Sequence, residues 1–246
     1  MPGTTSRGTY LSVKALGLAL CLTVSGYHDS AKGADWPQWR GPNRDGICRE
    51  TGLLKSWPEE GPKIVLELTG LGKGYSSVAI VEGRLYTMGD VEVESKNVQC
   101  VLAYDLSTHS RLWAAPVGPP HDDGGPRCTP TVDGGLIYAV GTSGDVVCLD
   151  AATGSLRWSR NFQKDLGGKN PGWKFSESPL IDGDKLVCTP GGRDAVMVAL
   201  DKKTGEVLWR CSMPDIGPKG KDEAGYSSIV PATAAGVPQY VQLTNK

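Results

Sequence analysis

One eleven-residue pattern occurs three times in this chain and constrains its fold more than any other feature. Each copy starts with a small residue, has Asp at its third position and ends in Trp eight residues after that Asp. The copies occupy residues 103–113, 148–158 and 199–209. Recurrence at roughly 40–50 residues matches the length of one propeller blade. The pattern therefore predicts a chain built from similar supersecondary units.

A second repeat lies out of phase with the first and completes each unit. It consists of two short apolar runs separated by a turn that contains Gly. Its copies occupy residues 76–86, 128–138 and 177–187, and a fourth begins at residue 227. Together the two repeats read as four short strands joined by tight turns, the pattern of a β-propeller blade. Complete blades are expected at about 76–113, 127–158 and 175–209, with a partial blade at 226–246.

The turn of the first repeat contains residue types that suit a tight reversal between two strands. Asp can accept hydrogen bonds from the backbone at the turn entrance, and Gly tolerates positive φ at its exit. Gly154 and Gly205 occupy the exit in the second and third copies, whereas His109 replaces Gly in the first. The Asp residues at the entrance are Asp105, Asp150 and Asp201.

A Trp ends every copy of the first repeat, as Trp113, Trp158 and Trp209. Large rings at a fixed offset predict packing against a neighbouring blade. The pattern Ala-x-Asp-x-x-Thr-Gly-x-x-x-Trp resembles the tryptophan-docking motif of the quinoprotein-type, or PQQ-like, β-propeller repeat family, over residues 63–246. The resemblance implies an all-β propeller of four-stranded blades, about three and a half of which are present.

The same resemblance implies that each Trp ring stacks on the Gly turn of the next blade. Trp113 is then expected on Gly154, and Trp158 on Gly205. Cys148 stands where the motif has Ala, so the second copy departs from the family pattern. A motif of this kind is strong support for a fold and weak support for a function.

Residues 63–68 form an apolar run ahead of the first blade, in the phase of an outer strand. They are expected to be a ring-closing strand that completes a blade whose other strands lie elsewhere. The fourth unit stops in mid-pattern, and the family resemblance implies more blades than this chain supplies. The chain is therefore expected to be a C-terminally truncated fragment of a longer protein.

Residues 1–34 have the layout of a secretory signal peptide and leader. Arg7 and Lys14 precede the apolar run 16–24, and small residues follow it. The run is short for a membrane span. Cleavage is expected between residues 24 and 35, with export to the periplasm or the cell exterior; a buried N-terminal strand is the alternative.

Residues 35–62 are rich in Trp, Pro and Gly and are expected to form an irregular opening segment. Its Trp36 and Trp39 have two interpretations. They plug one end of the propeller, which is the commoner role of such rings, or they offer a surface on which a ligand stacks.

Composition narrows the function classes. A formal net charge of −1 gives no indication of a nucleic-acid partner, and no run predicts a membrane-spanning segment. Six cysteines follow the leader without a recurring spacing, so both disulfides and buried thiols remain open. The three His residues are scattered and predict no metal site.

Few residues are candidates for chemistry. Glu177 is the one carboxylate at the start of an expected first strand, and it is the candidate for a ligand or general base on the propeller axis. A satisfied structural carboxylate is the alternative. Arg127, Trp173 and Lys174 lie in expected loops at one propeller face and are the candidates for binding.

Two functions from different classes follow from the family resemblance. The first is an exported, non-catalytic binding or scaffold module that needs no cofactor and presents a propeller face to a protein or glycan partner. The second is an alcohol dehydrogenase that depends on PQQ and Ca²⁺, for which the resemblance implies an axial acidic base and oxygen ligands. The binding module is favoured, because the chain shows no grouping of carboxylates and amides beyond Glu177.

Overall fold

The computed structural model describes residues 33–213, 215 and 217–244. The leader expected at residues 1–34 lies outside this range except for its last two residues. Residues from Ala34 onward form one compact unit. In the described part of the chain no helix is both long and apolar enough to cross a membrane.

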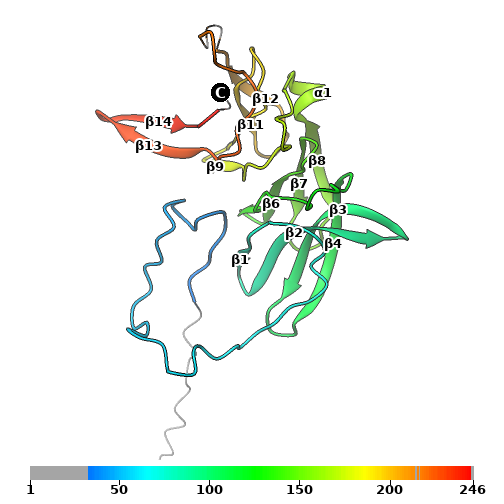
Figure 1. Cartoon of the computed structure of the whole chain (residues 1–246), viewed down its shortest axis with the longest axis vertical. Helices are drawn as coiled ribbons and strands as arrows, with labels where there is room; N and C mark the ends of the chain where they lie inside the picture. The colour runs from blue at the N-terminus through cyan, green and yellow to red at the C-terminus, as the bar shows by residue number, and fades with distance from the viewer. Residues whose placement is uncertain (1–32, 214, 216, 245–246) are drawn as a thin grey trace, which may run out of the picture. The chain divides into compact units, whose positions relative to one another are not determined.

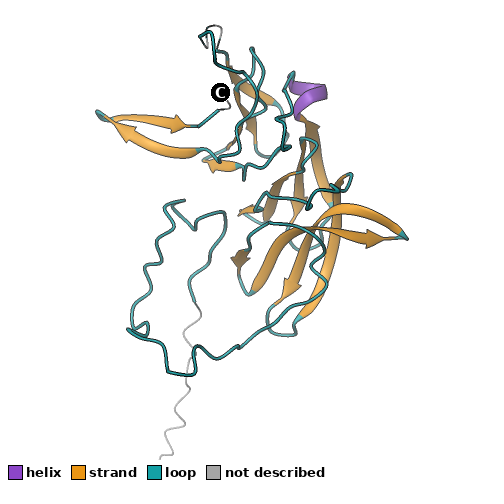
Figure 2. Cartoon of the chain, in the orientation of Figure 1, coloured by secondary structure: helices purple, strands orange, loops and turns teal. Residues whose placement is uncertain are grey.

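The regular secondary structure of the described residues is almost entirely antiparallel β-sheet, joined by long loops (Figures 1 and 2). Blade 1 contains β1 (Ala79–Val81), β2 (Arg84–Val93), β3 (Lys96–Asp105) and β4 (Ser110–Gly118). Blade 2 contains β5 (Thr131–Asp133), β6 (Leu136–Val140), β7 (Asp145–Asp150) and β8 (Leu156–Asn161). Blade 3 contains β9 (Leu180–Asp182), β10 (Lys185–Cys188), β11 (Met197–Asp201) and β12 (Val207–Cys211).

A two-stranded hairpin follows the third blade, with β13 (Val230–Ala234) and β14 (Val237–Val241). One short helix, α1 (Phe162–Leu166), connects blades 2 and 3. Within each blade the strands pair in chain order, and the first strands of adjacent blades contact each other. These three blades and a half confirm the all-β propeller predicted from the repeats.

The Asp turns join the third and fourth strands of each blade in the same way. Each Asp side chain accepts hydrogen bonds from the two backbone N–H groups that lie two and three residues further on. For Asp201 these come from Lys203 and Thr204, both at 2.8 Å. Gly205 leaves the turn at a φ of 72°, and His109 takes up the same region at 57° in blade 1. Local hydrogen bonds and positive φ therefore fix these turns.

A small residue faces each Trp across the outer strand pair. Ala103 pairs with Trp113, Cys148 with Trp158 and Ala199 with Trp209. All three small residues are fully buried. A β-bulge follows immediately in each blade, which increases the local twist of the outer strand. Cys148 thus performs the same packing role as the two Ala residues.

The Trp rings lie against the Gly turns of the next blade. A Cβ atom built on Gly154 would come within 2.7 Å of the Trp113 ring, and one on Gly205 within 2.7 Å of the Trp158 ring. The Trp158 indole also donates a hydrogen bond to the carbonyl of Lys202 at 3.0 Å. Only Gly fits beneath each ring, so these two positions couple adjacent blades.

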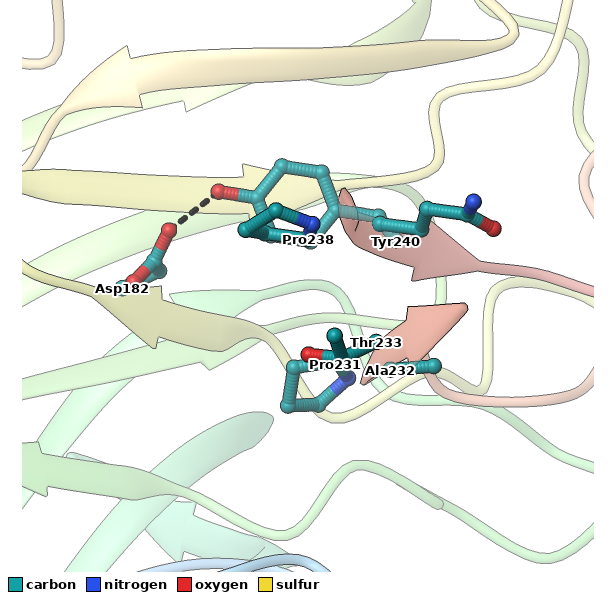
Figure 3. A pocket seen from close by; sticks show the side chains of 7 residues that line it. Asp182, Pro231, Ala232, Thr233, Pro238 and Tyr240 are labelled. Carbon is teal, nitrogen blue, oxygen red and sulfur yellow. Dashed lines mark hydrogen bonds between the residues drawn. The ribbon is translucent and has the colours of Figure 1, made fainter. Parts of the chain in front are cut away.

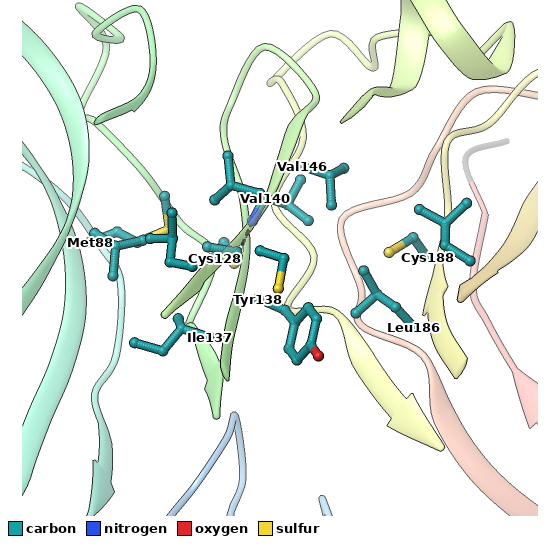
Figure 4. Close-up of a cluster of buried hydrophobic side chains, with 14 of the residues drawn as sticks. Met88, Cys128, Ile137, Tyr138, Val140, Val146, Leu186 and Cys188 are labelled. Carbon is teal, nitrogen blue, oxygen red and sulfur yellow. Dashed lines mark hydrogen bonds between the residues drawn. The ribbon is translucent and has the colours of Figure 1, made fainter. Parts of the chain in front are cut away.

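Apolar side chains fill the space between the blades. Figure 4 shows Met88 of blade 1, Ile137 and Tyr138 of blade 2, and Leu186 of blade 3 in one buried cluster. Such interblade burial is the main stabilising contribution, at roughly 25 cal/mol per Å² of apolar surface. The six cysteines of the described residues are free thiols, and four of them are buried.

Residues 63–68 do not form the strand expected from their apolar pattern. They belong to no sheet of the described residues, and Ile64 and Val65 are 77% and 84% exposed. An extended segment becomes a strand only when a neighbour satisfies its backbone hydrogen bonds. No other described strand pairs with this run, and the blade that it was expected to complete has its other strands elsewhere, so the ring-closing strand stays a prediction.

Candidate functional site

The opening segment runs along the first strands of the blades. Trp36 forms a two-way backbone bridge with Ile80 of β1, with N···O distances of 2.8 and 2.9 Å. The Pro37 carbonyl then accepts a hydrogen bond from Val132 of β5 at 2.8 Å. These contacts cover strand edges that would otherwise expose unpaired backbone groups.

Arg44 anchors the opening segment to blade 3. Its side chain is 2% exposed. Its guanidinium donates to the carbonyl oxygens of Ser178 and Pro179, at 2.8 and 3.0 Å, and to the Gln38 side chain at 3.0 Å. Burial lowers the pKa of Arg44 to about 10, so it stays charged at neutral pH. The sequence analysis missed this residue, because no local pattern marks it.

Glu177 lies close to this buried cation. It is 3% exposed, and its Oε1 accepts a hydrogen bond from the backbone N–H of Thr189 at 2.6 Å. Its Oε2 has no hydrogen-bond partner in the described part of the chain. Burial raises the pKa of Glu177 to about 7, and the Thr189 hydrogen bond and the charge of Arg44 oppose that rise.

The surroundings of Glu177 do not fit Ca²⁺. Ca²⁺ takes six to eight oxygen ligands, mainly carboxylates and carbonyls. The groups that interact electrostatically with Glu177 include the Arg44 guanidinium and the buried thiols of Cys128 and Cys188. Within the described residues, no three His, Cys, Asp or Glu side chains come together as a metal site. The nearby charge of Arg44 and the scarcity of oxygen ligands both disfavour a divalent cation beside this carboxylate.

A cavity of about 560 Å³ opens where the loops precede the first strands. All three blades, the hairpin and the opening segment contribute to it. The lining residues are Trp39, Tyr75, Arg127, Trp173, Ser176, Ser178, Tyr226, Ser227 and Ser228. We call this the face cavity. It contains the predicted residues Arg127 and Trp173, whereas Lys174 does not line it.

Two tyrosines of the face cavity escaped the sequence analysis, although a signal for them exists. Gly-Tyr-Ser-Ser occurs twice, at residues 74–77 and 225–228, directly before β1 and before β13. Each copy therefore places a Tyr at the same end of its blade, as Tyr75 and Tyr226. The second repeat, defined by its apolar runs, starts at Ser76 and at Ser227 and so does not include the Tyr that precedes each start.

Two aromatic rings of the face cavity, Tyr75 and Trp39, lie close to guanidinium groups. The guanidinium of Arg127 lies 5.8 Å from the centre of the Tyr75 ring. The guanidinium groups of Arg40 and Arg44 each lie 5.3 Å from the Trp39 ring. Trp39 therefore lies beside the buried Arg44 guanidinium and lines the cavity, and its two interpretations, an end plug and a ligand-stacking surface, stay predictions.

A second hollow lies between blade 3 and the hairpin (Figure 3). It measures about 360 Å³, and its polar anchor is Asp182, which accepts a hydrogen bond from the Tyr240 hydroxyl. Tyr240 also stacks on Trp209, with ring centres 6.0 Å apart. Asp182 and the Tyr240 hydroxyl are hydrogen-bonded to each other, so they are less available to bind a ligand than the unpaired polar groups of the face cavity.

Four-stranded blades with docked Trp rings and a loop-lined face define a β-propeller of the PQQ-like class. The family model described as outer membrane protein assembly factor BamB matches residues 97–236, more than half of the chain. The chain belongs to this family of PQQ-like repeat proteins.

Relatives of two kinds resemble the chain. A quinoprotein ethanol dehydrogenase of Pseudomonas aeruginosa is 28% identical over 174 residues, which are 63% of this chain and 26% of that protein. An outer membrane protein assembly factor BamB of Shewanella oneidensis is 32% identical over 123 residues, 48% of this chain and 31% of that protein. The chain thus spans about a quarter to a third of these relatives.

Among solved structures, the quinohemoprotein alcohol dehydrogenase of Comamonas testosteroni superposes with a TM-score of 0.51. The match has 21% sequence identity and covers 74% of this chain and 28% of that one. This similarity shows the fold.

Proposed function

We propose that this chain is part of an exported, non-catalytic binding module that uses the face cavity to hold a protein partner. The observation that supports this most is the residue content of the cavity. Trp, Tyr and Arg are the residue types that dominate binding energy at protein interfaces. Five of the nine lining residues are of these types, and Trp173 is 68% exposed.

The alternative is a PQQ- and Ca²⁺-dependent alcohol dehydrogenase, which the quinoprotein relatives favour. That activity would use the axial carboxylate as a ligand or base. Glu177 is instead hydrogen-bonded to the backbone and lies near Arg44, a structural arrangement that supports the binding module. The export proposal rests on the charge and apolar layout of residues 1–34.

Cofactor uptake tests the choice between these functions. The protein, purified in the longest form that its gene encodes, is mixed with PQQ and Ca²⁺ and then desalted. We expect no retained quinone absorbance and no alcohol-dependent dye reduction. Retention of one quinone together with dye reduction that Glu177→Gln abolishes would establish the dehydrogenase instead.

Crosslinking in the producing cell tests for a partner at the face cavity. A photoreactive phenylalanine analogue replaces Trp173, and in a matched control it replaces Trp57, which is 69% exposed and lies outside the cavity. We expect a crosslinked protein from position 173 and none from position 57. Equal crosslinking from the two positions would contradict the assignment of the cavity.

A further inference from the structure

We propose that the face cavity recognises a carboxylate of its protein partner and that Arg127 receives this group. The inference rests on the proposed function, because it specifies the chemistry of the ligand at the same site. The charge of the lining is the first observation. Arg127 is cationic, and none of the other eight lining residues carries an acidic side chain.

The second observation is the incomplete hydrogen bonding of Arg127. Its Nη1 is buried and has no hydrogen-bond partner among the described residues. Its Nη2 donates to the Asp123 carbonyl at 3.4 Å, longer than a normal N–H···O bond. An unpaired buried donor is destabilising, because it has lost its hydrogen bonds to water without gaining a replacement. A ligand carboxylate can accept from both guanidinium nitrogens at once and would remove this cost.

The serine hydroxyls of the cavity are already engaged within the chain. Ser176 donates to the Lys174 carbonyl, and Ser227 to the Leu243 carbonyl. The Ser178 and Ser228 hydroxyl oxygens accept from the backbone N–H groups of Thr129 and Ser178. Each of these hydroxyls already has at least one partner within the chain, whereas Nη1 of Arg127 has none among the described residues, so Arg127 supplies the unpaired donor of the site.

The aromatic side chains of the cavity determine which residue types fit beside the ligand carboxylate. Tyr75 is 71% exposed and Trp173 68% exposed, so both rings present apolar faces to a ligand. Tyr75 packs beside Arg127, and the Tyr226 hydroxyl accepts a hydrogen bond from the Trp173 backbone at 3.1 Å. An acidic residue beside an aromatic or aliphatic residue therefore matches the cavity.

Short peptides test this inference. Three hexapeptides with identical apolar flanks carry a central Asp with a C-terminal amide, a central Asn with the amide, or a central Asn with a free C-terminus. Calorimetric titration measures their affinity for the full protein. We expect the Asp peptide to bind at least tenfold more tightly than the amidated Asn peptide. Tight binding of the third peptide would identify a chain-terminal carboxylate as the source.

Arginine variants assign the effect to one residue. Arg127→Gln should abolish the preference for Asp over Asn, and Arg127→Lys should retain part of it, because the charge remains without the planar fork. Arg111→Gln, an exposed arginine outside the cavity, serves as the control and should leave the preference unchanged. Thermal melts check that each variant is folded.

Equal binding of the Asp and Asn peptides by the wild-type protein would overturn the carboxylate inference and leave the binding function standing. Absence of binding by all three peptides would overturn it too, and crosslinking at position 173 then decides the proposed function independently. Retention of PQQ in the desalting assay, displaced by none of the peptides, would refute both.

Discussion

Glu177 is a carboxylate that folding removes from water without giving both oxygens a partner. Its neighbour Arg44 is equally buried, yet the two groups form no direct ion pair within 4.0 Å in the described residues. Desolvation of each charge is therefore only partly offset by attraction between them. The burial of Glu177 carries a pH-dependent cost.

Glu177→Gln should remove this cost. The pKa of Glu177 is raised from 4.5 to about 7, so folding favours its protonated form. Wild-type stability from this group is fully present below pH 4.5 and is lost as the pH rises through about 7. The linkage amounts to about 3 kcal/mol. We expect the Gln variant to lose less free energy of unfolding than wild type between pH 5 and pH 8 in urea melts.

The exposed Glu206→Gln variant is the control, and its pH dependence should match that of wild type. Parallel pH profiles for wild type and Glu177→Gln would mean that Glu177 is ionised in the folded protein throughout this range.

At the scale of the element, each blade is joined to the next through a Trp ring on a Gly turn. Trp158→Ala should destabilise the protein by about 3–5 kcal/mol, as the loss of a large packed ring does. His109→Gly should change stability by less than about 0.5 kcal/mol. The relief of its positive φ is offset by greater freedom of the unfolded chain, and the His109 side chain is exposed.

Urea melts of the two variants measure the difference. Similar losses of unfolding free energy in both would contradict the coupling of blades through Trp158.

How far the sequence predicts an element depends on whether its cause is local. The strands, the Asp turns and the pairs Trp113 with Gly154 and Trp158 with Gly205 follow from short patterns that recur, so they could be read in advance. Residues 63–68 have a strand-like pattern but pair with none of the described strands, and pairing is not a local property. Arg44 donates a hydrogen bond to the carbonyl of Ser178, 134 residues away in the sequence, and no pattern of neighbouring residues predicts that contact.

The candidate site shows the same division. Arg127 and Trp173 stood out as loop residues of recognisable binding types. Their convergence with Trp39 depends on the path of the opening segment across three blades, which repeats alone do not specify. The Gly-Tyr-Ser-Ser repeat would have revealed Tyr75 and Tyr226, since a repeated loop residue takes an equivalent place in each blade.

At the scale of the whole molecule, removal of the predicted signal peptide can be measured directly. N-terminal sequencing of exported protein should find a start between residues 25 and 35, because the apolar run 16–24 has the length of a signal peptide. The cytoplasmic fraction serves as the reference for the uncleaved form. An intact Met1 in the exported fraction would refute cleavage.

The path of the opening segment affects how the three blades unfold. In a repeat protein each unit contacts only its neighbours, so units can melt one after another. Here a single stretch from Trp36 to Arg44 is hydrogen-bonded to β1, to β5 and to the residues just before β9. Opening any one of these blades breaks contacts that the other two share. We therefore expect the three blades to melt as one cooperative unit, although their sequence is modular.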